Sequence, residues 1–209
     1  MFKIIFWLVI LLNCLAIVGS IFMGLDEGDI SFFFQERQTA TFLSALQLAL
    51  ISFMALLIYV LGRIIYKKEP GNLKLIRIWI ISAAVFTFAV IDEYFMLHEG
   101  IDGNIATAFF GITENPHLDG LTLSLYGIVA IFLFFRFKEE ILKYRQALLL
   151  FVIGGFFFLA SITLDIKSTE KLRIVLEESA KLIAVGFLLL GHVSVLIEHL
   201  RKVDQGLSR

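Results

Sequence analysis

The sequence predicts an all-α integral membrane protein, built as one domain over residues 1–209 from a bundle of six transmembrane helices. Of its 209 residues, 59% are hydrophobic and only 18% are charged. Soluble domains carry about 25% charged and 45–50% apolar residues, so the composition excludes that class. Phenylalanine is abundant at 22 residues and proline occurs only twice, which favours long uninterrupted helices over sheets.

Six segments are long and apolar enough, or nearly so, to cross a bilayer. A spanning helix needs about 20 mostly apolar residues, because it rises 1.5 Å per residue across a ~30 Å hydrocarbon layer. The predicted spans cover residues 4–25, 41–61, 76–97, 118–137, 146–164 and 172–197.

The first span resembles a signal peptide, because Lys3 precedes an apolar run and Gly19-Ser20 follows it with small residues. However, the apolar core of a signal peptide is about 7–15 residues long, and this run is longer. We therefore predict a retained helix.

The connections between the predicted spans alternate between ones with many lysines and arginines and ones with few. Counting the N-terminus as inside, 13 of the 18 lysines and arginines lie on the inner side and 5 on the outer side. Loops on the cytoplasmic side are enriched in these residues. The sequence therefore predicts a multi-pass protein of the cell membrane with both termini in the cytoplasm. The net charge of −1 gives no indication of nucleic-acid binding.

The acidic residues have the opposite bias, with 14 of 19 on the predicted outer side. Several of these lie where the third span ends. Counted from Ile78, Asp92 lies ~21 Å and His98 ~30 Å along the helix. Asp92 and Glu93 are thus predicted within the outer hydrocarbon, and His98 and Glu99 at the interface. Ionisable groups at membrane depth are costly and usually functional.

These four groups cannot converge on one ion, because successive residues of a helix point about 100° apart. A second wall is needed, and Glu177, Glu178 and Lys181 enter the sixth span at matching depth. The alternative is that Lys181 simply neutralises both glutamates, which lie three and four residues before it.

Carboxylates and imidazole together are ligands for zinc, iron or manganese. The ion is assigned to Asp92, to either His98 or Glu99, and to Glu177 from the sixth span. Bound water would then attack an ester or amide of a lipid-like substrate, as in metal-dependent hydrolysis.

The two carboxylates left over, Glu93 and Glu178, are the candidates for general base. No helical Glu-x-x-His supports this reading, since the one instance, Glu114 to His117, contains Pro116. For His192, deeper in the sixth span, a hydrogen bond to a neighbouring helix is the preferred interpretation.

Two other functions stay open. The same carboxylates suit a proton- or cation-coupled transporter or ion-binding protein, although no repeat or broken helix supports transport. The acidic outer side also suits a non-catalytic partner protein. The sequence determines neither the oligomeric state nor whether loop 98–117 forms a lid.

Overall fold

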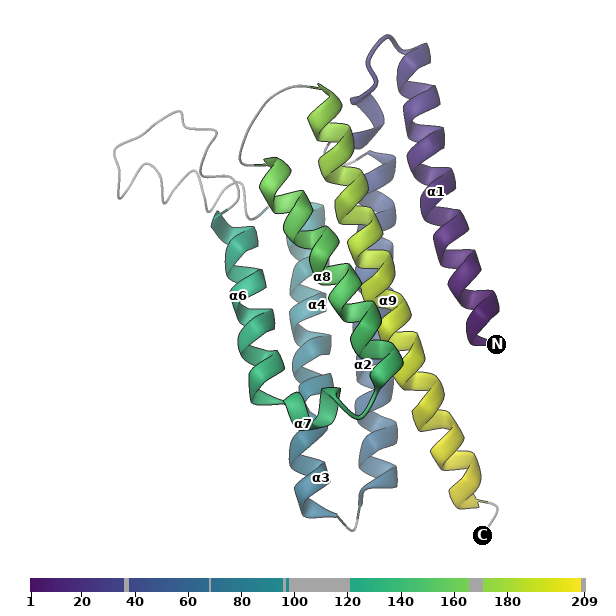
Figure 1. Ribbon diagram of the computed structural model, residues 1–209, viewed down its shortest axis with the longest axis vertical. Coiled ribbons are helices and arrows are strands. Elements are labelled where there is room, and N and C mark those ends of the chain that lie inside the picture. The colour runs from purple at the N-terminus through teal and green to yellow at the C-terminus, as the bar shows by residue number, and fades with distance from the viewer. Residues whose placement is uncertain (36–37, 68, 96, 98–120, 166–170, 208–209) are drawn as a thin grey trace, which may run out of the picture.

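The computed structural model describes residues 1–35, 38–67, 69–95, 97, 121–165 and 171–207, and within them it contains helices and no strand. In chain order these are α1 (Phe2–Asp26), the 3-10 turn η1 (Phe32–Phe34), α2 (Thr39–Ile65), α3 (Pro70–Leu75), α4 (Arg77–Phe95), α6 (Leu121–Arg136), α7 (Lys138–Ile141), α8 (Arg145–Asp165) and α9 (Lys171–Leu207). The predicted all-α membrane bundle is confirmed (Figure 1).

Five of the described helical segments are long and apolar enough to cross a membrane, and α6 is a shorter apolar helix. They correspond to the six predicted spans. The largest difference is α9, which the sequence predicted to end at residue 197 and which continues to Leu207. The predicted loop 98–117 and the predicted start of the fourth span at 118 lie outside the described residues.

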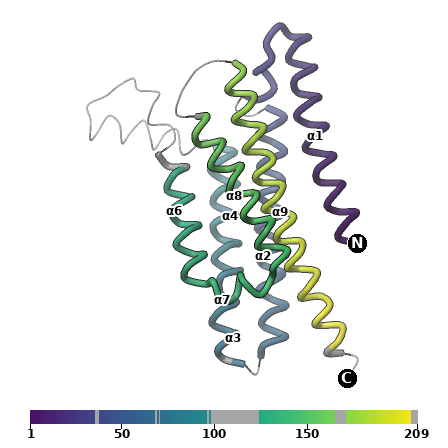
Figure 2. Tube along the Cα trace, in the orientation of Figure 1, coloured from purple at the N-terminus to yellow at the C-terminus, as the bar shows by residue number. Residues whose placement is uncertain are grey.

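The central helix of the bundle is α9. In its most apolar window 72% of the residues are buried, compared with 17–28% in the other four long segments. It packs against α8, α2 and α1, whereas α4 packs chiefly against α2 (Figure 2). Because α4 packs against α2, it contacts α9 through side chains such as Glu93 and Ser82. Helix α6 lies at the edge of the bundle beside α7 and α8.

Apolar side chains form the core in layers. One cluster joins Phe34 of η1 to Ala40 of α2 and Val175 of α9, and the middle cluster contains Ile51 and Leu190, both completely buried. Many large apolar side chains on the periphery are exposed, as expected for helices that face lipid.

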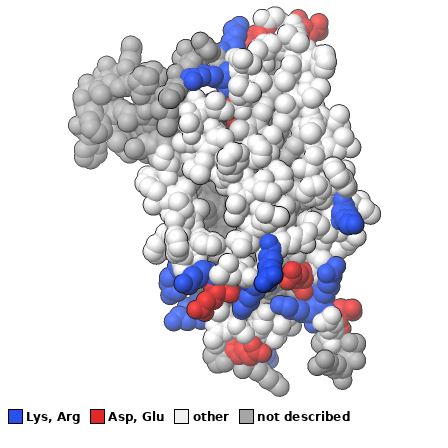
Figure 3. Space-filling view, viewed as in Figure 1, with Lys and Arg blue, Asp and Glu red and all other residues white. Residues whose placement is uncertain are grey.

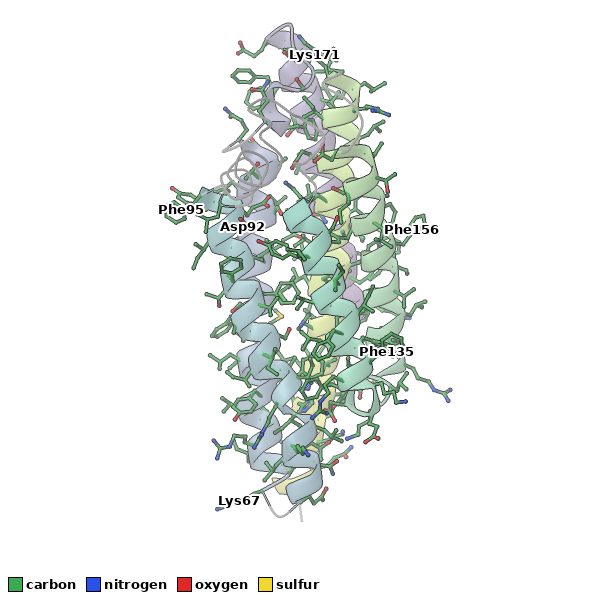
Figure 4. All side chains as sticks on the ribbon, turned by 90° about the vertical axis from the view of Figure 1, so that its left-hand side faces the viewer. Lys67, Asp92, Phe95, Phe135, Phe156 and Lys171 are labelled. Carbon is green, nitrogen blue, oxygen red and sulfur yellow. The ribbon has the colours of Figure 1, made fainter. Side chains whose placement is uncertain are left out.

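Charged side chains gather at the ends of the bundle. On the face drawn in Figure 3, Lys and Arg crowd the lower end and the middle is mostly uncharged. We call the end where α2 meets α3 and α9 terminates the basic end, and the end where α1 turns into η1 the far end. Lys67 and Lys171 mark the basic and far ends in Figure 4.

Asp29 organises the turn at the far end. Its carboxylate accepts hydrogen bonds from the backbone N–H and the hydroxyl of Ser31, and it pairs with Lys171 at 2.7 Å. These contacts lower the pKa of Asp29 to about 2 from its ordinary value of 3.8, with the Lys171 contact as the largest cause.

Acid is expected to weaken this turn. A depressed carboxyl pKa contributes stability above the unfolded value of 3.8, and this contribution is lost as pH falls towards about 2. Pepsin cleavage between Leu25 and Phe34 should therefore accelerate from pH 4 to pH 2. The variant Asp29→Asn should remove this acceleration, and the exposed-site control Asp26→Asn should retain it.

Amide side chains connect three helices inside the bundle. Asn13 of α1 donates from Nδ2 to the Leu182 carbonyl of α9 at 3.3 Å, and Gln47 of α2 donates from Nε2 to Asn13 Oδ1 at 2.5 Å. Gly186 makes this approach possible, because a Cβ atom there would lie 2.3 Å from Asn13 Nδ2.

Gly186→Ala should therefore destabilise the protein by about 1–3 kcal/mol, the usual cost of overpacking a filled interior. Thermal unfolding of the purified protein in detergent measures the effect. Gly155→Ala is the matched control, since a Cβ atom at Gly155 meets nothing within 4 Å. Equal melting temperatures for the two variants would contradict this account of the packing.

Candidate functional site

The last turn of α4 places two carboxylates beside different neighbouring helices. Asp92 is 3% exposed and accepts a hydrogen bond of 2.7 Å from the hydroxyl of Tyr126 on α6. The Tyr126 ring also lies edge-on to Phe88, one turn earlier on α4. Asp92 thus turns into the bundle, where Figure 4 labels it, and it connects α4 to the peripheral helix α6.

The other carboxylate, Glu93, reaches the central helix. Lys181 Nζ lies 3.2 Å from Glu93 Oε1 and 2.7 Å from Glu178 Oε1. The local pairing of Lys181 with Glu178 was one of the two sequence interpretations, and it is present. The ammonium also joins a second helix, so α4 and α9 face each other at Glu93.

Burial makes this ion-pair network energetically important. The side chains of Glu93, Glu178 and Lys181 are only 12%, 8% and 11% exposed. Removing charges from water costs several kcal/mol per ion, which the mutual attraction offsets only when the pairing is good. Loss of one partner would leave an uncompensated charge inside the bundle.

Of the remaining predicted metal ligands, the structure describes only Glu177. Glu177 is half-buried on α9, next to Glu178. His98 and Glu99 lie outside the described residues. Within the described part of the chain, no three His, Cys, Asp or Glu side chains are grouped so that they could hold a metal ion. The zinc, iron or manganese site thus stays a prediction.

His192 lies in an aromatic layer between the two ends. Its Nδ1 donates to the Leu188 carbonyl at 2.8 Å, and its Nε2 is 3.1 Å from the Ser82 hydroxyl of α4. Because a carbonyl can only accept, Nδ1 carries the proton, and in the neutral ring Nε2 accepts from Ser82. The predicted hydrogen bond between His192 and a neighbouring helix is therefore present.

Phenylalanine and tryptophan rings surround this histidine. The rings of Trp79, Phe86 and Phe151 stand edge-on to the imidazole at centroid distances of 5.2–5.8 Å. In this apolar setting the side chain of His192 is only 3% exposed.

Sequence reasoning missed a second buried polar cluster at the basic end. Glu140 is completely buried. It pairs with Lys143 at 2.7 Å and accepts hydrogen bonds from Tyr144 at 3.1 Å and Trp79 at 3.4 Å. In the sequence Glu140 belongs to the charged run 138–140, which is typical of a solvated loop. One local feature indicated that Glu140 could have partners: Lys143 and Tyr144 follow it by three and four residues, the spacing at which side chains of a helix meet.

The partners of Glu140 explain why it is tolerated there. Burial and the neighbouring Glu140 carboxylate raise the pKa of Tyr144, so its hydroxyl keeps the proton that it donates. Lys202 of α9 lies 3.2 Å from the Tyr66 hydroxyl and covers the rings of Tyr66 and Tyr144. These contacts connect α9 to the short helix α7 through Tyr144. We therefore assign the cluster a structural role at the basic end.

Lys181→Met should lower the free energy of unfolding by about 3 kcal/mol or more, because it leaves two buried carboxylates without their shared ammonium. Adding Glu93→Gln should recover part of this loss, since one charge is then removed. Lys171→Met is the matched control: its side chain is 58% exposed, and exposed pairs contribute about 0–1 kcal/mol. Equal losses in the two lysine variants would contradict the burial argument.

Comparison with known proteins gives a family but no activity. Residues 5–195 match the family model described as "Domain of unknown function (DUF8692)". No curated protein and no solved structure matches the chain significantly.

Proposed function

The chain belongs to the DUF8692 family, and we propose that this member binds a proton or small cation within the membrane and exchanges it with the far side. One observation carries the proposal: Lys181 Nζ lies between Glu93 Oε1 and Glu178 Oε1, at 3.2 and 2.7 Å. Two carboxylates from different helices thereby surround a position that a positive charge already occupies.

The location of this position supports ion binding. Charged side chains in a membrane-spanning bundle are costly, face its interior and commonly mark ion or proton pathways. Asp92 adds a buried carboxylate at the neighbouring position of α4, with its own hydroxyl partner in Tyr126. The described cluster thus combines three carboxylates with one ammonium that can give up its proton.

The exchange that we propose is balanced in charge. A monovalent cation enters between Glu93 and Glu178, and Lys181 releases one proton to water as its ammonium becomes a neutral amine. One positive charge enters as another leaves, so the bundle never holds an additional buried charge. A buried lysine suits this role because its pKa is readily shifted by its surroundings.

The competing proposals have less support among the described residues. A divalent metal held by Asp92 and Glu177 would lie near the Lys181 ammonium, which repels it, and His98 and Glu99 lie outside the described residues. Hydrolysis of a lipid-like substrate and docking of a partner protein remain predictions from the sequence.

The charge pattern supports an orientation. We propose that the basic end faces the cytoplasm and that the far end, with the carboxylates, faces outwards, because cytoplasmic loops are enriched in lysine and arginine. Both termini are then cytoplasmic, and the cluster receives its ion from the outside.

Flux measurements on the full chain in liposomes test the proposed function. A pH gradient should drive uptake of a monovalent cation, and Asp92→Asn and Glu93→Gln should each reduce the rate by about tenfold or more, the usual size of losing one charged interaction. The control Glu27→Gln removes an exposed carboxylate at the same end and should leave the rate unchanged. Flux that does not depend on Asp92 and Glu93 would reject the proposal.

A further inference from the structure

The hydrogen bonds between Asn13 and Gln47 have a direction that α9 imposes. The Leu182 carbonyl can only accept, so Asn13 must present its Nδ2 group to it. Asn13 Oδ1 then faces Gln47, which must present Nε2 in turn. The series of bonds therefore ends on Gln47 Oε1, a carbonyl oxygen that carries lone pairs and no hydrogen.

That oxygen is buried and has no hydrogen-bond partner. Gln47 is 4% exposed, and its Oε1 lies 3.4 Å from the Cβ position of Gly186. Three serine hydroxyls nearby are also buried without a partner: Ser44 one turn along α2, Ser179 one turn before Leu182 on α9, and Ser20 two turns along α1. Unpartnered oxygens thus come from all three helices that meet at the amide pair.

Such oxygens are costly at this depth. Gln47 lies eight residues into α2, ~12 Å along the helix and therefore within a ~30 Å hydrocarbon layer. Each unsatisfied polar group in the hydrocarbon region costs several kcal/mol unless another group satisfies it. A bound species that takes up lone pairs would satisfy the Gln47 carbonyl and the serine hydroxyls together.

We propose that Gln47 Oε1, Ser44 Oγ and Ser179 Oγ help to bind a monovalent metal cation of the sodium class. The ligands are neutral oxygens, which suit a singly charged ion, whereas divalent ions usually take carboxylates. Coupling ions in membrane transporters are bound by protein oxygens such as backbone carbonyls. This inference rests on the proposed function, for which it names the ion and a second site.

Glu178 and Ser179 connect the two sites. They are consecutive on α9: Glu178 pairs with Lys181, and Ser179 lies seven residues before Gly186, on the helix face whose Cβ position meets Asn13 and Gln47. The carboxylates of Glu93 and Glu178 would attract the cation, and the neutral oxygens would receive it from there.

Thermal unfolding of the purified full-length protein in detergent tests the inference, with NaCl compared with choline chloride at equal ionic strength. A cation that binds only the folded state raises the melting temperature in a concentration-dependent way. We expect sodium to stabilise the parent protein. Ser44→Ala and Gln47→Met should each require roughly tenfold more sodium for the same shift, the effect of losing one ligand atom.

Ser52→Ala is the matched control on α2. Its hydroxyl is already engaged, 2.9 Å from the Ala83 carbonyl and 2.8 Å from Thr87 Oγ1, so the variant should keep the parent's sodium response. Ser44→Ala removes a hydroxyl without a partner and should fold. The absence of sodium-specific stabilisation in the parent, or an unchanged response in both Ser44→Ala and Gln47→Met, would overturn the inference.

The two proposals can fail separately. A sodium response that Glu93→Gln abolishes and the Ser44 and Gln47 variants retain would reject the neutral-oxygen site and support the carboxylate site. A response that depends on Ser44 and Gln47, together with liposome flux that does not depend on Asp92 and Glu93, would reject the proposed function and support the neutral-oxygen site.

Discussion

The structure depends on one constraint: a polar side chain inside the bundle needs a partner from the protein, commonly on another helix, because hydrocarbon offers none. The central helix α9 concentrates these contacts. From the far end to the basic end it meets Glu93 of α4, Asn13 of α1, Ser82 of α4 and Tyr144 beside α8. Packing of apolar side chains fills the space between these contacts, while the contacts determine which face of α9 meets which neighbour.

The same constraint separates the two acids of α4. Consecutive residues on a helix point about 100° apart, so Asp92 meets α6 and Glu93 meets α9. The described carboxylates of the outer cluster therefore make two sets of contacts. Asp92 contacts α6, and Glu93 and Glu178 share the Lys181 ammonium between α4 and α9. This division is the basis of the ion-binding proposal, because Glu93 and Glu178 already share the Lys181 ammonium.

Much of the fold and part of the site follow from local pattern. Apolar length predicted the spans, and spacing predicted the pairing of Glu178 with Lys181. Glu140 was missed, because a glutamate in a charged run is usually solvated. It is buried because α7 packs against α4, where Trp79 donates a hydrogen bond to it. Tyr126 was missed as the partner of Asp92, because nothing in a single sequence indicates which helix lies opposite another.

The sequence by itself determined that this is an α-helical membrane protein, which segments are apolar enough to be candidate spans, and that acids lie near the far end of the third of them. These properties follow from apolar length and charge, which act locally. Only the tertiary structure decided that α9 is central, that Lys181 joins two helices, and that Gln47 ends a series of hydrogen bonds beside Gly186. Such contacts depend on how helices distant in the chain rotate and pack, and neither composition nor spacing specifies this.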